Sequence, residues 1–298
     1  MTGKSGRVAF VLAGGASLGA VEVGMLRALY ERGVRPQFIV ATSAGALNGA
    51  FIASRPQTVE TADELGETWR GLRRGRVFPV NLVIGLLGFL GARDHLVPDG
   101  AMRKLITSHI EHDRLEQMPL ELHVIAVDVV TGEEVRLSRG PAVEAVMASA
   151  AIPGVLPTVP WEGRDLIDGG VANNTPISHA VELGASEVYV LPTGNACALT
   201  EPPGGALAMA LHALSLLMQR RLIDDIESHR DRVKLVVLPP PCPLSIEPID
   251  FGHAGLLIDR AYADACEFLD GGGSERPPIR MRMHGHSRGT EDATIAEG

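Results

Sequence analysis

The chain has 298 residues, of which 45% are hydrophobic and 21% are charged, as is typical of a globular protein with a large core. Its formal net charge of −9 gives no reason to expect a nucleic-acid partner. Three widely spaced cysteines argue against a disulfide framework or a zinc site, and no apolar run reaches the roughly 18 to 20 residues of a membrane span. We therefore expect a cytoplasmic protein.

The first part of the chain alternates between strand and helix patterns. The apolar run from Val8 to Leu12 predicts a strand buried on both faces, and a helical pattern follows it until Gly33. A second strand is expected over Phe38–Ala41 and a second helix over Ala44–Ala53. This alternation with short links predicts an α/β fold, with helices on both faces of a mainly parallel sheet.

The later elements are less regular. Residues 57–118 are expected to be helical and irregular. Beyond them we expect strands over Leu122–Val127, Glu134–Leu137, Glu187–Leu191 and Val233–Leu238, a helix that ends before Pro153, and a long helix over Leu207–Ile226. From residue 271 the composition offers little to bury. We therefore predict one three-layer α/β/α domain over residues 5–270 and a mobile tail over residues 271–298.

A serine, Ser43, stands where the second strand turns into the second helix, in the segment QFIVATSAGALNGA. A sharp strand-to-helix turn exposes a nucleophile at the edge of a sheet, and it accommodates only small neighbours. The neighbours are Ala41, Thr42, Ala44 and Gly45. The start of the helix also offers backbone N–H groups beside the hydroxyl. An ordinary N-cap serine is the alternative, and this segment alone does not decide between them.

A glycine-rich turn, Gly14-Gly15-Ala16, follows the first strand and is expected at the same sheet edge as Ser43. Consecutive backbone N–H groups there suit an oxyanion hole. The rival interpretation is a nucleotide-binding enzyme, because Gly14-x-Ala16-x-x-Gly19 fits a relaxed dinucleotide fingerprint. That fingerprint needs an acidic residue at the end of the second strand to hold a ribose, and this chain has none there.

Two kinds of side chain compete as the base that would activate the serine. Asp168, in DLIDGGVANNTP, follows two apolar residues and precedes two glycines, so a tight turn is expected behind it. Held close to Ser43, its carboxylate would accept the hydroxyl proton directly. The alternative is an aspartate in a hairpin turn, and spacing alone leaves this open. The scattered histidines are expected to be structural or on the surface: His95, His112, His123 and His179.

Four segments, in order, resemble the patatin-like phospholipases, which are serine acyl hydrolases with a Ser–Asp dyad. VLAGGASLGAVEVGML is similar to their glycine-rich oxyanion segment, and ATSAGALNGA to their Gly-x-Ser-x-Gly elbow. VIAVDVVTGEEVRLSRG, continuing through AVMASAAIPGVLPTVPW, resembles their middle strands and Ala-Ser-x-x-Pro-like helix end, and LIDGGVANNTP resembles their Asp-Gly-Gly/Ala segment. The order and the combination are specific, although each motif alone is not.

The resemblance implies Ser43 as nucleophile, Asp168 as base, and oxyanion donors from the backbone of Gly14, Gly15 and Ala16. It implies a fatty acyl ester of a phospholipid or other lipid as substrate, with no metal or cofactor. A non-catalytic member of the fold that binds lipid or protein is the alternative, which the intact serine and aspartate disfavour.

Three residues depart from the family pattern. Ala16 and Ala41 stand where glycine is usual, and Leu18 stands where a basic residue is common. We expect the turns to survive if φ stays negative at both alanines. Leu18 bears on headgroup preference more than on catalysis.

The segment Arg70–Ala92 combines four arginines with an apolar run in which Asn81 is the only polar side chain. Basic residues beside an apolar segment suit a peripheral contact with an anionic membrane surface. The alternative is a segment packed over the acyl pocket, because most apolar runs are buried.

Overall fold

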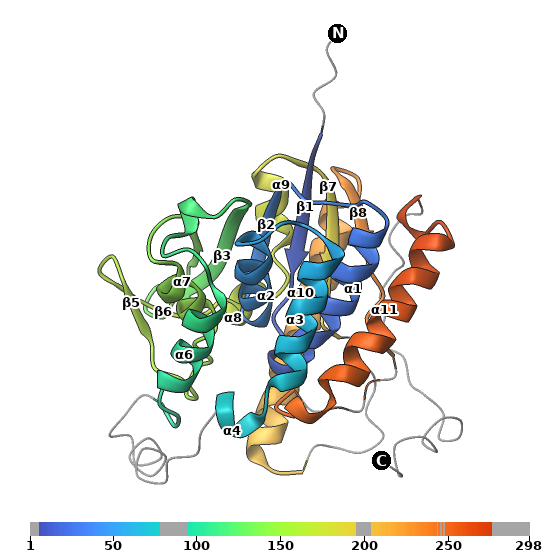
Figure 1. Ribbon diagram of the computed structural model, residues 1–298. Coiled ribbons are helices and arrows are strands. Elements are labelled where there is room, and N and C mark those ends of the chain that lie inside the picture. The colour runs from blue at the N-terminus through green and yellow to red at the C-terminus, as the bar shows by residue number, and fades with distance from the viewer. Residues whose placement is uncertain are drawn as a thin grey trace, which may run out of the picture.

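The computed structural model describes residues 6–77, 95–194, 204–242, 244, 246 and 248–275. Within these ranges an eight-stranded sheet carries helices on both faces, as Figure 1 shows. The strands are β1 (Arg7–Leu12), β2 (Phe38–Thr42), β3 (Glu121–Asp128), β4 (Glu134–Leu137), β5 (Val159–Trp161), β6 (Arg164–Asp168), β7 (Ala185–Leu191) and β8 (Lys234–Val237).

The helices connect these strands in chain order. The α-helices are α1 (Ala20–Glu31), α2 (Ala44–Ala53), α3 (Val59–Gly71), α4 (Arg74–Val77), α6 (Gly100–His109), α7 (Ala142–Ser149), α8 (Gly170–Asn173), α9 (Ile177–Glu182), α10 (Ala206–His229) and α11 (Ala254–Asp270). The 3₁₀ helices are η1 (Ala16–Gly19), η2 (Leu115–Gln117), η3 (Phe251–His253) and η4 (Gly273–Glu275). No helix in the described ranges has both the length and the apolarity needed to cross a bilayer.

Five parallel strands form the main part of the sheet, in the order β3-β2-β1-β7-β8. Strands β4 and β6 pair with β3 in the antiparallel direction, and β5 pairs with β6. Because the five parallel strands point the same way, the loops that follow them meet at one edge of the sheet. The predicted three-layer α/β/α fold with a mainly parallel sheet is confirmed.

Alternate residues of the central strands face two different cores. Phe10 and Leu12 of β1 belong to the larger core, which includes residues of α1, α2, α3, α7 and α11. Ala9 and Val11 belong to a smaller core with residues of α9 and α10. Figure 1 shows α1, α3 and α11 in front of the sheet and α9 and α10 behind it. The uninterrupted apolar sequence of β1 from Val8 to Leu12 follows from this burial on both faces.

The end of the described chain lies beyond the domain boundary predicted at residue 270. Helix η4 packs against α11 and β8, and Gly273 lies against the ring of Phe268. The rest of the predicted tail, from residue 276, lies outside the described residues. The apolar run at residues 80–92 also lies outside them.

Helices α1 and α11 pack closely together at Gly24. A Cβ atom on Gly24 would lie 2.2 Å from the carbonyl oxygen of Ile258 and 2.6 Å from the backbone nitrogen of Tyr262. We therefore expect Gly24→Ala to lower the free energy of unfolding by roughly 1–3 kcal/mol, because the two helices must move apart.

Gly71, the last residue of α3, provides the matched control. Nothing lies within 4 Å of the position that its Cβ would take, so Gly71→Ala should leave stability unchanged or raise it slightly. Denaturant unfolding of both variants tests this. Equal stability of the two would contradict the close packing of α1 on α11.

Candidate active site

Ser43 links β2 to α2 in a strained backbone conformation. Its φ is 54° and its ψ is −120°, a combination that non-glycine residues rarely adopt. The hydroxyl makes no capping hydrogen bond to α2 and instead donates to Oδ2 of Asp168 over 2.6 Å. Ser43 therefore stands at the N-cap position of the helix without acting as a capping side chain.

The elbow is held in place by its neighbours. The N–H of Ser43 donates to Oγ of Ser149 over 2.8 Å, and that hydroxyl donates to the carbonyl oxygen of Ile125 over 2.6 Å. A Cβ on Gly45 would lie 2.5 Å from the carbonyl oxygen of Leu12. Only glycine fits this position, because the start of α2 presses against the end of β1.

The register of the sheet brings Asp168 to Ser43. Thr42, the last residue of β2, lies opposite Ile125 of β3, and Asp168 of β6 lies opposite the next residue, Ala126. Ser43 and Asp168, more than a hundred residues apart, therefore end two strands at neighbouring positions along β3. Helix α8 begins at Gly170, so Asp168 does not lie in a hairpin turn.

The carboxylate of Asp168 is nearly excluded from solvent, with 6% of the residue exposed. Burial raises the pKa of Asp168 to about 6, while the hydrogen bonds from Ser43 and from the N–H of Gly170 oppose this shift. Oδ1 accepts the Gly170 bond over 2.7 Å, which leaves Oδ2 directed at the hydroxyl. At pH 7 the group is mostly ionised, and a base whose pKa lies near the working pH is suited to proton transfer.

No histidine ring forms a hydrogen bond with Ser43 or Asp168 within the described ranges. His123 and His179 pair with glutamates, at 2.8 Å from Glu121 and 2.7 Å from Glu134. The same part of the chain contains no cluster of three or more His, Cys, Asp or Glu side chains that could hold a metal ion.

The glycine turn lies against the elbow, and its three N–H groups differ in availability. A Cβ on Gly14 would lie 3.0 Å from the Cβ of Ser43. The N–H of Gly14 donates to the carbonyl oxygen of Asn174 over 3.0 Å, so this expected oxyanion donor is already engaged. The N–H groups of Gly15 and Ala16 have no acceptor in the described part of the chain.

The condition of a negative φ, on which the expected turn depended, is not met at Ala16. The φ of Ala16 is +50°, the region that glycine occupies at little cost. Ala41 lies inside β2 and has no positive φ, so the condition is met there. The alanine at position 16 therefore adds a methyl group to a backbone shape that favours glycine.

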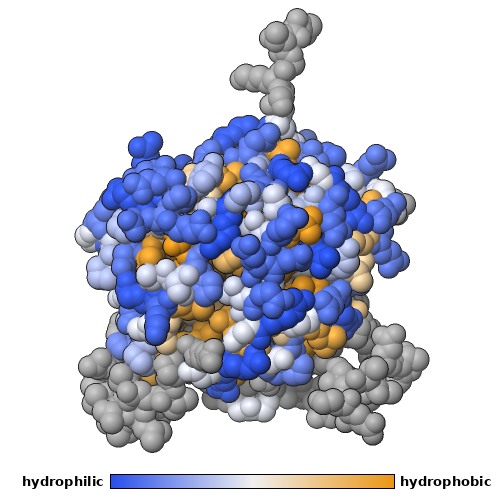
Figure 2. Space-filling view, viewed as in Figure 1, coloured by the Kyte–Doolittle hydropathy of each residue, from blue (hydrophilic) through white to orange (hydrophobic). Residues whose placement is uncertain are grey.

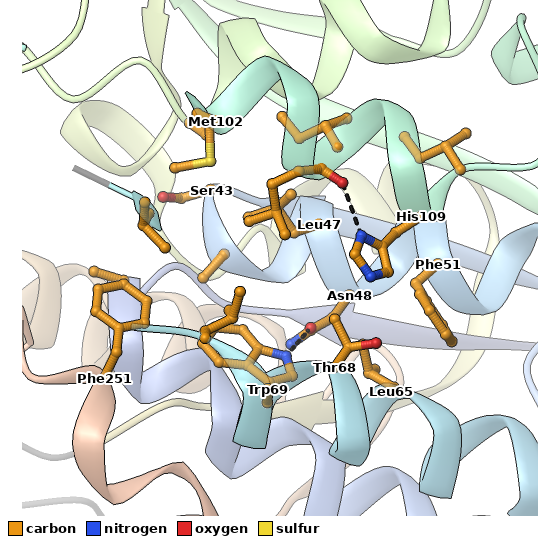
Figure 3. A pocket seen from close by; sticks show the side chains of 18 of the residues that line it. Ser43, Leu47, Asn48, Phe51, Leu65, Thr68, Trp69, Met102, His109 and Phe251 are labelled. Carbon is orange, nitrogen blue, oxygen red and sulfur yellow. Dashed lines mark hydrogen bonds between the residues drawn. The ribbon is translucent and has the colours of Figure 1, made fainter. Parts of the chain in front are cut away.

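An apolar pocket opens beside Ser43, between α2, α3 and α6. Figure 3 shows Met102 and Leu47 near Ser43, and Phe51 and His109 at the far end. Trp69 forms one wall and stacks on Phe251, with ring centroids 6.3 Å apart. A lining of this kind suits the hydrocarbon part of a ligand. Leu72 and Val77, from the start of the predicted Arg70–Ala92 contact, also line it.

One polar network lies behind the pocket wall. Oδ1 of Asn48 accepts a hydrogen bond from the Trp69 indole over 2.8 Å, and its amide donates to Glu22 over 2.8 Å. Glu22 is fully buried, and burial raises its pKa well above the ordinary range. Sequence reasoning did not single out Glu22 or Asn48. A lone acid within the apolar segment VEVGML was the available signal.

Comparison with known proteins defines the family. The family model described as "Patatin-like phospholipase" matches residues 10–181, more than half of the chain. The chain belongs to this family. Its relatives include a patatin-like phospholipase domain-containing protein of Caenorhabditis elegans, 30% identical over 65% of this chain and 14% of that protein.

Two further relatives are a mycobacterial and a fungal protein. An uncharacterized NTE family protein of Mycobacterium tuberculosis is 31% identical over 59% of this patatin-like chain and 46% of its own length. Lysophospholipase nte1 of Aspergillus terreus is 26% identical over 63% of this chain and 12% of its own length. The chain thus spans less than half of each of these relatives.

The positive φ of Ala16 yields a stability prediction. We expect Ala16→Gly to raise the free energy of unfolding by about 0.5–1 kcal/mol, because glycine relieves the strain but has more freedom to lose on folding. Ala41→Gly is the matched control and should lower it by about 1–2 kcal/mol, because it removes a buried methyl group from a strand. Chemical denaturation measures both. A loss of stability in both variants would count against a strained turn.

Proposed function

We propose that this patatin-like protein hydrolyses a fatty acyl ester of a phospholipid or other lipid through a Ser43–Asp168 dyad. The observation that carries the proposal is the 2.6 Å hydrogen bond from the Ser43 hydroxyl to a buried carboxylate, in a strained elbow beside an apolar pocket. The names of the relatives support a hydrolase of lipid esters in general, since they include phospholipases and a lysophospholipase.

The chemistry proceeds through an acyl-enzyme. Oδ2 of Asp168 takes the hydroxyl proton as Oγ of Ser43 attacks the ester carbonyl. The tetrahedral intermediate then collapses, and the alcohol leaves with the proton from Asp168. Water enters, gives a proton to Asp168, and attacks the acyl-enzyme. Collapse of this second intermediate returns the proton to Ser43 and releases the fatty acid.

The oxyanion is stabilised by backbone N–H groups of the glycine turn. Gly15 and Ala16 are the proposed donors, because the N–H of Gly14 is engaged by Asn174. Ala16 also lines the pocket beside Ser43, where the carbonyl of a bound ester would lie. One such donor typically contributes about 2.7–4 kcal/mol to stabilisation of the transition state.

Removal of either dyad residue should abolish ester hydrolysis. Ser43→Ala removes the nucleophile, and Asp168→Asn removes the base while its amide still bonds Ser43 and Gly170. We expect each variant to lose at least a thousandfold in kcat/KM for a short soluble ester, because nucleophile and base act as one unit. A fluorophosphonate should label Ser43 in the native chain and should label neither of these two variants.

The control for this experiment is His109→Ala, which alters the far end of the pocket and leaves the dyad intact. It should be labelled by the fluorophosphonate as fully as the native chain. Failure of the native chain to react with the probe or with any acyl ester would favour a non-catalytic lipid- or protein-binding role. Inactivation by a histidine substitution in a folded variant would favour a triad.

The raised pKa of Asp168 predicts a pH profile. The carboxylate must be ionised to accept a proton, so kcat/KM for a soluble ester should rise with pH through about 6 and level off above pH 7. Between about pH 4 and pH 6 the unfolded chain binds fewer protons at Asp168 than the folded chain does. The contribution of Asp168 to the stability of the fold therefore falls as pH rises.

Asp168→Asn lacks this titration. At pH 8 we expect it to be more stable than the native chain by roughly 3 kcal/mol at most, and at pH 4 the difference should vanish. Urea unfolding at the two pH values measures this. If the difference in stability between the two chains does not grow between pH 4 and pH 6, ionisation of Asp168 does not destabilise the folded chain.

A further inference from the structure

Helix α10 changes character along its length. Its C-terminal half packs behind the sheet, where Leu222 and Ile226 belong to the smaller core. The sequence from Gly204 to Met218 contains no charged residue, and the charged half of the helix begins only at Arg220. An apolar helical segment of this composition is ordinarily buried against another element.

The apolar half of α10 presents an exposed stripe. Met209, Ala213 and Leu217 follow one another at intervals of four residues, so they lie on one face of the helix. Met209 is 47% exposed and Leu217 is 68% exposed. None of the described side chains between Met209 and Met218 is fully buried. Figure 1 shows this gold end of α10 extending beyond the carboxyl ends of the strands.

This stripe adjoins the candidate active site. The Cε of Met218 lies 3.2 Å from the position that a Cβ on Gly170 would take, and the N–H of Gly170 bonds Asp168. The next residue, Val171, exposes 46% of its surface to solvent. Exposed apolar side chains therefore begin three residues after the proposed base, at the sheet edge where an ester would enter.

The charged side chains next to the stripe are paired with one another, which favours an apolar contact over an electrostatic one. The guanidinium of Arg220 pairs with Asp224 at 3.3 Å, and that of Arg221 pairs with Asp225 at 3.1 Å. These acids offset the cations that border the stripe, and the chain carries a formal charge of −9. Attraction to an anionic surface is therefore not the driving force on this side of the molecule.

We propose that the Met209–Leu217 stripe inserts into the boundary between headgroups and acyl chains of a phospholipid surface. This inference rests on the proposed function, because the two-chain phospholipids among the proposed substrates reside in such a surface. Exposed apolar side chains on a helix that passes beside the site fit a partner with an apolar interior. Unlike the membrane contact expected over Arg70–Ala92, this interface does not depend on anionic lipid.

Co-sedimentation with phosphatidylcholine vesicles tests the inference, with Ser43→Ala protein used so that hydrolysis does not alter the vesicles. Leu217→Asp in that background should bind at least tenfold more weakly. Ser228→Asp adds the same charge to the exposed C-terminal end of α10 and should bind like the parent. Both should keep the parent's melting temperature, because both side chains are exposed. Undiminished binding by Leu217→Asp, or no binding by the parent, would overturn the inference.

Kinetic measurements on the chain that retains Ser43 distinguish membrane docking from catalysis. Leu217→Asp should keep its kcat/KM for a short soluble ester and lose at least tenfold on phosphatidylcholine vesicles. If the parent binds vesicles but cleaves no ester, the proposed function is contradicted and the docking surface is still supported. A parent that is dimeric by analytical ultracentrifugation and becomes monomeric with Leu217→Asp would assign the stripe to a second copy instead.

Discussion

The contact between Ser43 and the buried carboxylate of Asp168 is the interaction on which the rest of the site depends. A carboxylate that is 6% exposed loses most of its hydration, and two hydrogen bonds replace only part of it. The fold therefore tolerates an unfavourable charge at this point. The same desolvation raises the basicity of the carboxylate, so the burial that is unfavourable for folding is what the proposed proton transfer requires.

That contact exists because the sheet changes direction next to it. Parallel strands alone would leave only loops beyond Ser43, whereas the antiparallel strand β6 extends along β3 past the end of β2. Its last residue, Asp168, is thus delivered by a strand and held by the register of a ladder. A carboxylate on a rigid element keeps its distance from the hydroxyl better than one on a mobile loop.

Short-range sequence patterns were enough to predict some of the helices and strands. Helix α2 and strand β4 have the predicted bounds, because small and apolar residues mark their ends clearly. Strands β5 and β6 and helix α11 were not predicted, since the strands are short and α11 owes its place to long-range packing on α1. The sequence suggested Ser43 and Asp168 as partners, but their contact depends on strand register. The occupied N–H of Gly14 depends on a tertiary contact with Asn174 that has no local sequence signal, whereas the glycine usual at position 16 in the family was the available sign of the positive φ there.

The pocket and the glycine turn are joined through the side-chain amide of Asn48. Its oxygen holds the indole of Trp69 on α3, and its nitrogen holds both Glu22 on α1 and the carbonyl oxygen of Gly19. Gly19 is the last residue of η1, the 3₁₀ helix that begins at Ala16 of the turn. Loss of one member would leave buried polar groups unpaired, which costs more than a neutral substitution elsewhere. The Trp69 wall of the pocket and the backbone of the turn are therefore held by the same side chain.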